Sequence, residues 1–224
     1  MQNEIESFLS LYLSEYKTLE NKKTLAYWKA ANSGDPKDFG EYAKSDVALK
    51  TFHSDKSKYE KIIDLLNAKG SISELHKRSL EVALLAFKGN QISKSLIDEM
   101  VSAQSEIELK FNTYRAEYNG KKLSNNDLLD ALKNEKNLVE RKAMWEALKQ
   151  VGAEVSSKLT ALAEVRNKAA LELGYSNFWE MQIRLEEHDP SHLEKLFSDL
   201  ERLTDEPYRE AKRKIDTETS ARLG

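Results

Sequence analysis

The sequence predicts an all-α fold, a multi-helix array built from long helices. Its 224 residues include only 8 glycines and 3 prolines, and a chain with so few turn-forming residues reverses direction rarely. Apolar residues recur three and four positions apart along almost the whole chain, as they do on amphipathic helices. We therefore expect a single helical region over residues 1–224, with a subdivision into residues 1–90 and 91–224.

Composition and charge exclude several classes of function. The net charge is −3 and the two signs are mixed along the chain, so no basic patch marks nucleic acid as a partner. The lack of cysteine excludes disulfides, thiolate catalysis and cysteine-based zinc sites. No apolar run approaches the roughly 20 residues of a membrane span. The N-terminus lacks the pattern of a secretory signal, which favours the cytoplasm and leaves export open if a signal has been removed.

The start of the chain predicts helices separated by turns. Its first apolar stripe consists of Ile5, Phe8, Leu9, Tyr12, Tyr16 and Leu19. A second helical piece is expected over residues 25–31, before a turn at Ser33-Gly34-Asp35. Pro36 suits the first position of the next helix, which we expect to end near His53.

The middle of the chain continues this pattern. Two helices are expected to end at Gly70 and Gly89, and a longer one to cover residues 93–114. A short extended piece is expected over residues 114–123, which contain the turn-forming pair Asn-Gly. Ser124 has the character of an N-cap and predicts that a helix begins directly after it.

The longest helix is expected over residues 138–173. Gly174 should end it, because glycine takes the left-handed backbone conformation without the penalty that a Cβ imposes. A short helix over residues 177–187 follows. Asp189-Pro190 opens the last helix, and Pro207 is expected to kink or restart it, since proline lacks an N–H and clashes with the preceding turn. The residues expected to face inward on this helix are Leu193, Leu196, Leu200 and Leu203.

Histidines are the side chains to consider first as metal ligands, because cysteine is absent. The four are His53, His76, His188 and His192, and no H-E-x-x-H motif occurs. His188 and His192 lie four positions apart, but the Asp189-Pro190 pair between them signals a helix start, so a capping or solvated role is favoured over zinc binding. We expect His76 on the surface and His53 as an imidazolium at a helix end, where the helix dipole favours positive charge.

Other catalytic arrangements are missing from the sequence. Glu186 and Glu187 are adjacent, so they point to different faces of a helix and cannot share a proton. No Glu-x-x-His repeat of a di-iron centre, no nucleophile motif and no glycine-rich phosphate loop occurs in the 224 residues. We therefore expect neither a catalytic residue nor a metal ligand in this sequence.

Large aromatic residues belong either to the core or to a peptide groove. We expect Trp28 and Trp145 in the core, as is usual for large rings on helices. For the helix junction that contains Tyr175 and Trp179 the two interpretations are equally open. Tyr175, Trp179 and Arg184 are the candidates for contact with a substrate in a channel.

Arg166 and Asn167 stand near the end of the predicted longest helix. A buried arginine needs a partner for its charge, so this pair fits either a structural clamp or a cleft. We favour the structural clamp.

Several short motifs carry a resemblance to a known superfamily. In the second half they are Arg141 with Trp145, Lys149 with Gly152, Arg166-Asn167-Lys168-Ala169-Ala170, Leu173-Gly174-Tyr175, Phe178-Trp179-Glu180-Met181, His192-Leu193, Leu196, Leu200, Pro207-Tyr208 and Leu223-Gly224. Earlier ones are Ala30-Ala31-Asn32, Ser33-Gly34-Asp35, Asn112-Thr113-Tyr114-Arg115 and Asn119-Gly120-Lys121. Together they resemble zinc metallopeptidases of the angiotensin-converting-enzyme and oligopeptidase types, which share the gluzincin helical fold. The motifs are most specific after about residue 111.

The resemblance implies a part of a larger enzyme. Members of the superfamily hold zinc through two histidines that flank a catalytic glutamate and through a further glutamate, all downstream of the position that corresponds to Gly224. The resemblance therefore implies the N-terminal lid and one wall of a peptide channel in a peptidyl-dipeptidase or oligopeptidase. Zinc is expected in the parent enzyme and not in this chain. The implied partners are peptide substrates and the missing C-terminal catalytic half.

Two other interpretations stay open beside this one. The chain could be a stand-alone helical protein-interaction module without catalysis, or an unrelated helical bundle. The motif at Arg166-Asn167 and the block over residues 173–181 argue against an unrelated bundle. We expect the 224 residues alone to hydrolyse no peptide, even with added zinc, and to expose an apolar face where the catalytic half would dock.

Overall fold

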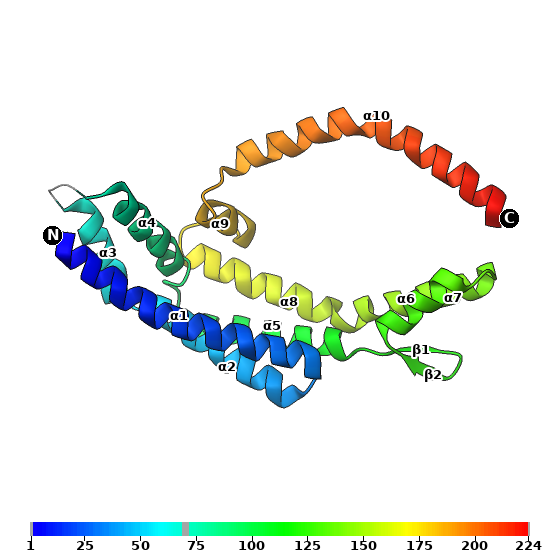
Figure 1. The fold of residues 1–224 in the computed structure, drawn as a ribbon, viewed down its shortest axis with the longest axis horizontal. Helices are drawn as coiled ribbons and strands as arrows, with labels where there is room; N and C mark the ends of the chain where they lie inside the picture. The colour runs from blue at the N-terminus through cyan, green and yellow to red at the C-terminus, as the bar shows by residue number, and fades with distance from the viewer. Residues whose placement is uncertain (1, 69–71, 224) are drawn as a thin grey trace. The chain divides into compact units, whose positions relative to one another are not determined.

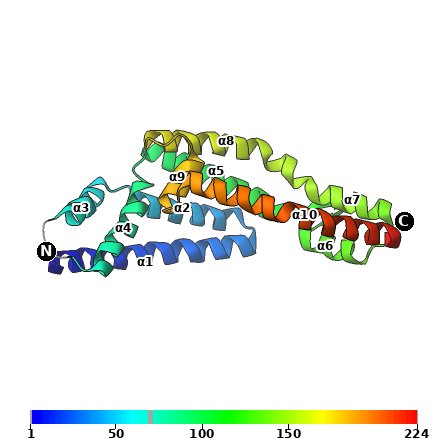
Figure 2. The same cartoon turned by 90° about the horizontal axis from the view of Figure 1, so that it is seen from above.

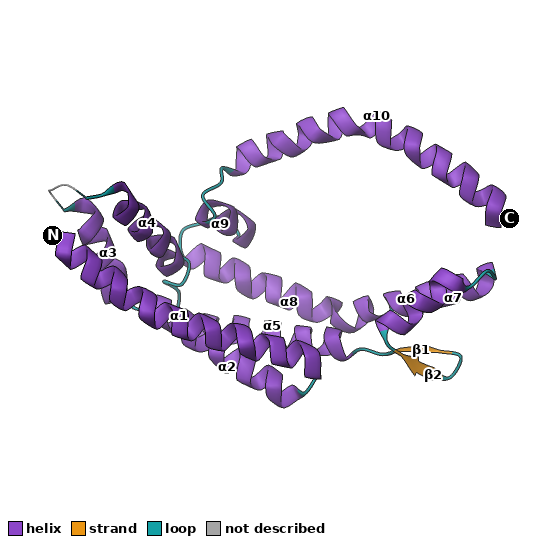
Figure 3. Cartoon of the chain, viewed as in Figure 1, coloured by secondary structure: helices purple, strands orange, loops and turns teal. Residues whose placement is uncertain are grey.

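The computed structural model describes residues 2–68 and 72–223. The predicted all-α class is confirmed, because regular structure in these residues consists of helices and one short two-stranded hairpin (Figure 3). The chain forms two compact units, which are described separately. Unit 1 comprises Met1–Thr113 and Val155–Glu186, and unit 2 comprises Tyr114–Glu154 and Glu187–Gly224. Neither unit coincides with the division expected near residue 90.

The regular structure described in unit 1 consists of helices. They are α1 (Gln2–Ser33), α2 (Pro36–His53), α3 (Lys56–Asn67), α4 (Glu74–Lys88), α5 (Lys94–Thr113), most of α8 (Val151–Glu172) and α9 (Phe178–Leu185). Helix α1 is continuous through the region where two helical pieces were expected, because neither glycine nor proline interrupts its 32 residues. Helices α1 and α2 lie side by side, and α5 runs beside α8 (Figures 1 and 2).

Local turn chemistry explains the sharp reversal between α1 and α2. Gly34 adopts φ +65°, a left-handed conformation that residues with a side chain adopt rarely. Asp35 then caps α2, because its Oδ1 accepts the N–H of Lys37 at 2.8 Å. Pro36 occupies the first helical position as predicted, and α2 ends at His53. The expected helix end at Gly70 lies outside the described residues; α3 ends at Asn67.

The core of unit 1 lies between α1, α2, α3 and α4. Its buried members are Ile5, Leu9, Phe52, Ile62, Leu65, Leu80, Ala83 and Phe87. Phe8, Tyr12, Tyr16 and Leu19 pack against this cluster, so the whole apolar stripe predicted at the start of the chain faces the core. Two smaller clusters join α5 to α8, one around Ile97 and Ala169 and the other around Ile107 and Leu162.

The end of α8 is a Schellman motif. The N–H of Tyr175 donates to the carbonyl of Ala170 at 3.0 Å, and the N–H of Gly174 donates to the carbonyl of Leu171 at 3.0 Å. Gly174 adopts φ +81° between them, which is the left-handed conformation that this motif requires. The predicted helix end at this glycine is therefore confirmed, and α9 begins four residues later, at Phe178.

Unit 2 begins with the extended piece expected after α5. Strands β1 (Ala116–Tyr118) and β2 (Lys121–Leu123) pair antiparallel, with Tyr118 opposite Lys121. The two loop residues, Asn119 and Gly120, have φ of 50° and 71°, which is the pattern of a type I′ hairpin turn. Helices α6 (Asn125–Asn134) and α7 (Leu138–Lys149) follow. Together with the hairpin they enclose a small core of Ala116, Leu128, Met144 and Ala147.

Ser124 caps α6 as predicted. Its hydroxyl accepts the N–H of Asp127, whose carboxylate accepts the N–H of Ser124, so the two residues form a capping box. This arrangement satisfies two backbone donors at the start of the helix.

The prediction of one continuous helix over residues 138–173 is wrong. Helix α7 ends at Lys149 and α8 begins at Val151, with Gln150 as the C-cap between them. The N–H of Gln150 donates to Ala147 instead of to a residue four positions back. Gly152, only two positions later, weakens helical structure here because glycine loses more backbone freedom than other residues on folding.

The longest helix is instead α10 (Pro190–Leu223), with 34 residues. It continues through Pro207, so the expected restart does not occur, and Figure 1 shows α10 as one gently curved helix. The expectation that its leucines face inward is wrong for three of the four, while Leu193 is half-buried. Leu196, Leu200 and Leu203 are 46%, 45% and 64% exposed, and no residue from Ser191 to Arg222 is buried.

The two tryptophans expected in the core are exposed. Trp28 lies two positions before the buried Ala30, and Trp145 lies two positions before the buried Ala147. Two positions along a helix correspond to about 200° of rotation, so each ring points away from the buried face of its helix. None of the helices in the described ranges combines the length and apolar composition that a bilayer span requires.

Candidate functional site

The junction between α8 and α9, within unit 1, holds several residues that the sequence singled out. The Oδ1 atom of Asn167 on α8 accepts the N–H of Phe178, the first residue of α9, at 2.9 Å. Asn177 caps the same helix by accepting the N–H of Glu180 at 2.8 Å. Two side-chain carbonyls therefore satisfy backbone donors that a helix leaves free in its first turn, and they fix α9 against α8.

Arg166 joins this junction to α5. Its guanidinium donates to Oε1 of Gln104 at 3.1 Å and lies 5.1 Å from the centre of the Phe178 ring. Gln104 in turn donates to Oε1 of Glu108 at 2.9 Å. One half-buried arginine thus contacts residues of α5 and α9 from its own position on α8. The structural role predicted for Arg166 and Asn167 stays a prediction, and these contacts support it.

The three substrate-channel candidates come from the same junction. Tyr175 is half-buried, with Nζ of Lys88 5.6 Å from its ring centre. The Trp179 side chain is 48% exposed. Arg184 donates from Nε to Oε1 of Glu180 at 2.7 Å. Their role in a channel stays a prediction.

Glu180 organises the first turn of α9. Its carboxylate accepts the hydroxyl of Ser176 and the guanidinium of Arg184. The Ser176 hydroxyl first, and the Arg184 guanidinium second, lower the pKa of Glu180 to about 2. A permanent negative charge at a helix N-terminus is also favoured by the helix dipole. Arg184 is therefore oriented by an ionised partner at every pH above that value.

A second site that the sequence did not reveal surrounds His53 at the end of α2. The His53 side chain is only 4% exposed, and its Nε2 lies 3.3 Å from the Tyr12 hydroxyl on α1. The rings of Tyr16, Phe52 and Phe87 have their centres 5.6, 5.0 and 5.1 Å from the imidazole. Burial lowers the pKa of His53 to about 4. The imidazole is therefore neutral at pH 7, and the expected imidazolium is wrong.

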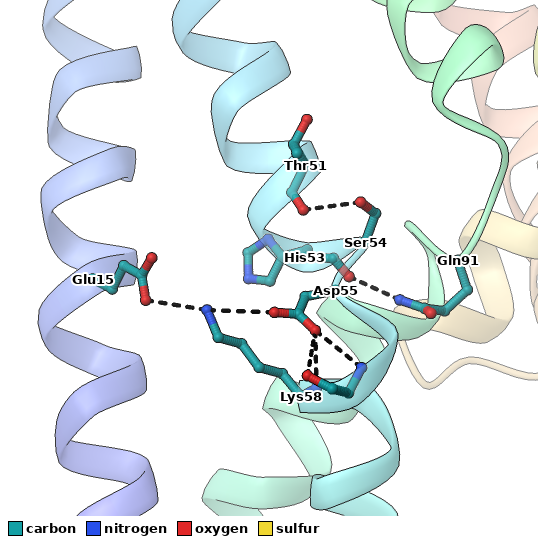
Figure 4. Close-up of polar contacts among 8 residues, drawn as sticks. Glu15, Thr51, His53, Ser54, Asp55, Lys58 and Gln91 are labelled. Atoms are coloured by element: carbon teal, nitrogen blue, oxygen red, sulfur yellow. Dashed lines mark hydrogen bonds and ion pairs between the residues drawn. The ribbon is translucent and has the colours of Figure 1, made fainter.

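Polar contacts at the end of α2 hold the His53 backbone in place (Figure 4). The carbonyl of His53 accepts the side-chain amide of Gln91 at 2.9 Å. Asp55 caps α3 by accepting the N–H of Ser57 at 2.9 Å, and the hydrogen bond from the Ser57 hydroxyl lowers the pKa of Asp55. Lys58 lies 3.2 Å from Oε2 of Glu15 on α1. These contacts connect α1, α3 and the loop between α4 and α5 around the end of α2, which carries the imidazole.

A cavity of about 330 Å³ lies beside this aromatic cluster, between α1 and α4. Tyr12 and Tyr16 of α1 line it, so one wall of the cavity is formed by rings that also contact His53. The sequence contained a signal for this pairing, since Tyr12 and Tyr16 are one helical turn apart. It contained no signal for His53 or Phe87, which reach the same place from other helices.

Unit 2 has a cavity of its own, of about 540 Å³, next to Arg141 and between α6 and α7. Arg141 donates from Nη1 to the carbonyls of Leu132 and Glu135 at 2.6 and 2.8 Å. These are carbonyls that the end of α6 leaves without partners. Arg141 therefore acts as a cap for α6, and the cavity has no comparable aromatic wall.

The histidines do not form a metal centre in the described ranges. Within residues 2–68 and 72–223 no group of three or more histidine, aspartate or glutamate side chains is placed to hold a metal ion. His188 precedes α10, and the N–H of His192 donates to Oδ1 of Asp189 at 2.8 Å, so both histidines lie at a helix cap. His76, which was expected on the surface, is half-buried on α4. These residues do not fit a zinc site.

Comparison with known protein families identifies a relationship that covers most of the chain. The sequence model of a peptidase family, described as angiotensin-converting enzyme, matches residues 1–215. No curated protein matches the chain. The match includes the junction between α8 and α9, the His53 cluster and most of α10.

Proposed function

This chain belongs to the angiotensin-converting enzyme family, and from that membership we propose that it is the non-catalytic, helical part of a zinc-dependent peptidase. The parent enzyme would be of the peptidyl-dipeptidase or oligopeptidase type. In it, the helices of this chain would shape and cover the channel that admits peptides. The observation that carries the proposal is the family match across residues 1–215.

The lack of zinc-binding motifs among these residues supports a non-catalytic role. The 224 residues contain no H-E-x-x-H motif, and the described ones contain no group that fits a zinc ion. A zinc peptidase needs protein ligands for the metal and a base for the attacking water. Those groups would therefore come from residues other than these, and zinc would be bound there.

The junction between α8 and α9 is the surface that we propose faces the peptide. Trp179 offers an exposed ring, and rings with a polar edge suit contact with peptides. Arg166 and Asn167 would act on the peptide only indirectly, because they hold Phe178 and the start of α9. Arg184, whose Nε donates to Glu180, would add a positive charge to the same surface, which suits a peptide carbonyl or carboxylate.

The exposed side of α10 would be the contact with the catalytic part. Leu196, Phe197, Leu200 and Leu203 are each at least 45% exposed, and they recur at helical spacing. Contiguous apolar surface of this kind marks an interaction site in a soluble protein. The same surface would serve the alternative function, a stand-alone helical module that binds a partner without catalysis.

The complete reading frame of the gene separates the two functions. A frame that encodes H-E-x-x-H supports the peptidase, whereas a frame without it supports the interaction module. The next step is to assay the complete gene product with short blocked peptides. Replacing Trp179 with alanine should raise KM several-fold and leave kcat nearly unchanged, since the ring would contribute to binding alone.

Trp28→Ala is the matched control, because Trp28 is also exposed, at 70% against 48% for Trp179, and lies outside the junction. It should leave KM unchanged. Equal effects of the two replacements would contradict a channel role for the junction. Chelator-sensitive peptide hydrolysis by residues 1–224 alone would overturn the non-catalytic assignment.

A further inference from the structure

The cavity between α1 and α4 has the properties of a small-molecule site. Its volume of about 330 Å³ lies within the range of about 300–1,000 Å³ that ligand pockets occupy. Both helices belong to unit 1, so the site is complete within one compact body. It shares no lining residue with the α8–α9 junction.

The lining of the cavity is apolar with one charged group. Tyr12, Leu13 and Tyr16 line it from α1, and Val82 and Ala86 line it from α4. Arg78 is the one charged side chain among its lining residues. Ser79 also lines it, but its hydroxyl donates to the carbonyl of Leu75 at 2.8 Å. The cavity therefore offers apolar walls and a single cationic group at one side.

The aromatic wall is held in place before any ligand arrives. The Tyr12 ring stacks between those of Tyr16 and Phe52, each with its centre 5.8 Å away, and its hydroxyl lies 3.3 Å from His53 Nε2. The hydroxyl is therefore engaged toward the core and not toward the cavity. A wall fixed in this way reduces the entropy lost when a ligand binds.

Arg78 supplies the charge that complements an anionic group, and it has partners of its own. One of them is Glu81 on α4, whose Oε2 lies 4.0 Å from Nη1 of Arg78. A guanidinium has five N–H donors, and pairs of them match the two oxygens of a carboxylate. The charge of the cavity therefore complements a carboxylate.

We propose that this cavity binds a small carboxylic acid with an aromatic or branched apolar body. The body would lie against Tyr12 and Tyr16, between the two helices, and the carboxylate would contact Arg78. This site is separate from the proposed peptide channel, and its binding activity requires neither zinc nor the catalytic part of a peptidase.

The test uses the full 224-residue chain and 3-phenylpropanoate as the probe. The probe is titrated while backbone amide resonances are followed by NMR, with 3-phenylpropanamide as the uncharged match. We expect a Kd of about 1 mM or tighter for a fragment of this size. Shifts should concentrate at Leu13, Val82 and Ala86, and the amide should bind at least fivefold more weakly than the acid.

Two kinds of variant locate the binding. Ala86→Leu fills the cavity from a half-buried position and should weaken binding at least tenfold, and Ser79→Leu provides a second filling variant if the first one fails to fold. Arg78→Gln should weaken binding of the acid until its affinity equals that of the amide. Lys77→Gln is the matched control, because it removes a charge from the neighbouring position of α4 and should leave the Kd unchanged.

The proposal is overturned by any of three results. They are the lack of saturable shifts up to 5 times the expected Kd of about 1 mM, shifts that Ala86→Leu and Ser79→Leu leave unchanged, and equal affinity for the acid and the amide. None of these results affects the proposed peptidase role, which rests on the family match and on Trp179.

Discussion

The two units use similar amphipathic helices in opposite ways. In unit 1, α1 to α4 turn their apolar stripes toward one another, and Phe87 and Ile62 are 0% exposed. In unit 2, the stripe of α10 has the same helical spacing, yet Phe197 is 62% exposed. Periodicity therefore shows which face of a helix is apolar, but burial depends on whether another element covers that face.

The polar contacts of the two units also differ, in how far apart along the chain the joined residues lie. In unit 1 they join distant parts of the chain, as Gln91 does with His53 and Arg166 does with Gln104. In α10 the ion pairs join neighbouring positions of the helix itself, such as Lys195 with Asp199 and Arg209 with Asp205. Exposed pairs of this kind stabilise a helix only slightly and contribute nothing to tertiary packing.

The largest expected contrast between the units comes from one substitution made in each. Phe87→Ala should lower the free energy of unfolding of unit 1 by about 3–5 kcal/mol, because it removes a fully buried ring and leaves a cavity. Phe197→Ala, at an exposed position of α10, should change stability by less than about 0.5 kcal/mol. Urea unfolding followed by circular dichroism measures both, and equal effects would show that α10 is covered in solution.

The second contrast concerns pH, because only unit 1 buries a histidine. The pKa of His53 is about 4 in the folded chain, against a usual value of 6.5. As the pH falls below 6.5, the unfolded chain binds a proton on this imidazole that the folded chain does not, so stability decreases until about pH 4. The total loss is about 3 kcal/mol. Thermal unfolding between pH 7 and pH 5 should show most of this slope.

His53→Phe should remove that slope, because phenylalanine fits among the rings and does not titrate. The interval above pH 5 isolates the effect, since carboxylates with lowered pKa values, such as Glu180, destabilise the fold only in more acidic solution. His188→Phe is the control at an exposed position and should keep the slope of the original chain. A slope that persists in His53→Phe would assign it to other groups.

How much the sequence predicts depends on how local each feature is. The helix start at Pro36, the cap at Ser124 and the helix end at Gly174 were predictable, because each depends on residues within one or two turns of the chain. The exposure of Trp28 was not predictable, since it depends on which helix face meets a partner. The neutral state of His53 depends on Tyr12 of α1 and on Phe87 of α4, which no local pattern brings together.

The residues of the candidate site also differ in how far the sequence predicts them. The sequence singled out Arg166 and Asn167 as a pair, and the structure shows the partners of each. It could not indicate that Phe178 would be a common partner of both, because that contact requires the chain to reverse direction after Gly174. The cavity beside Tyr12 is harder still to predict from the sequence, because its two walls are formed by separate helices.

Substitutions at two glycines, Gly174 and Gly152, compare the units through smaller changes in stability. Gly174, in unit 1, has φ +81°, and a Cβ there would meet no atom within 4 Å. Gly174→Ala should therefore destabilise the chain by about 1–2 kcal/mol through backbone strain alone. Gly152, in unit 2, is helical and equally open, so Gly152→Ala should stabilise it by about 0.5 kcal/mol. Opposite signs in urea unfolding test both expectations, and matching signs would contradict the assigned backbone conformations.

A further prediction tests a single hydrogen bond at the α8–α9 junction. Asn167→Ala removes the oxygen that accepts the N–H of Phe178 at 2.9 Å and should destabilise unit 1 by about 1 kcal/mol, as the loss of a helix cap does. Asn167→Asp keeps an acceptor in place and adds a negative charge near the start of α9, where the helix dipole favours it. It should therefore retain the original stability. If both variants lose stability equally, the acceptor oxygen is not what joins the two helices, and Arg166 with its contact to the Phe178 ring becomes the principal clamp.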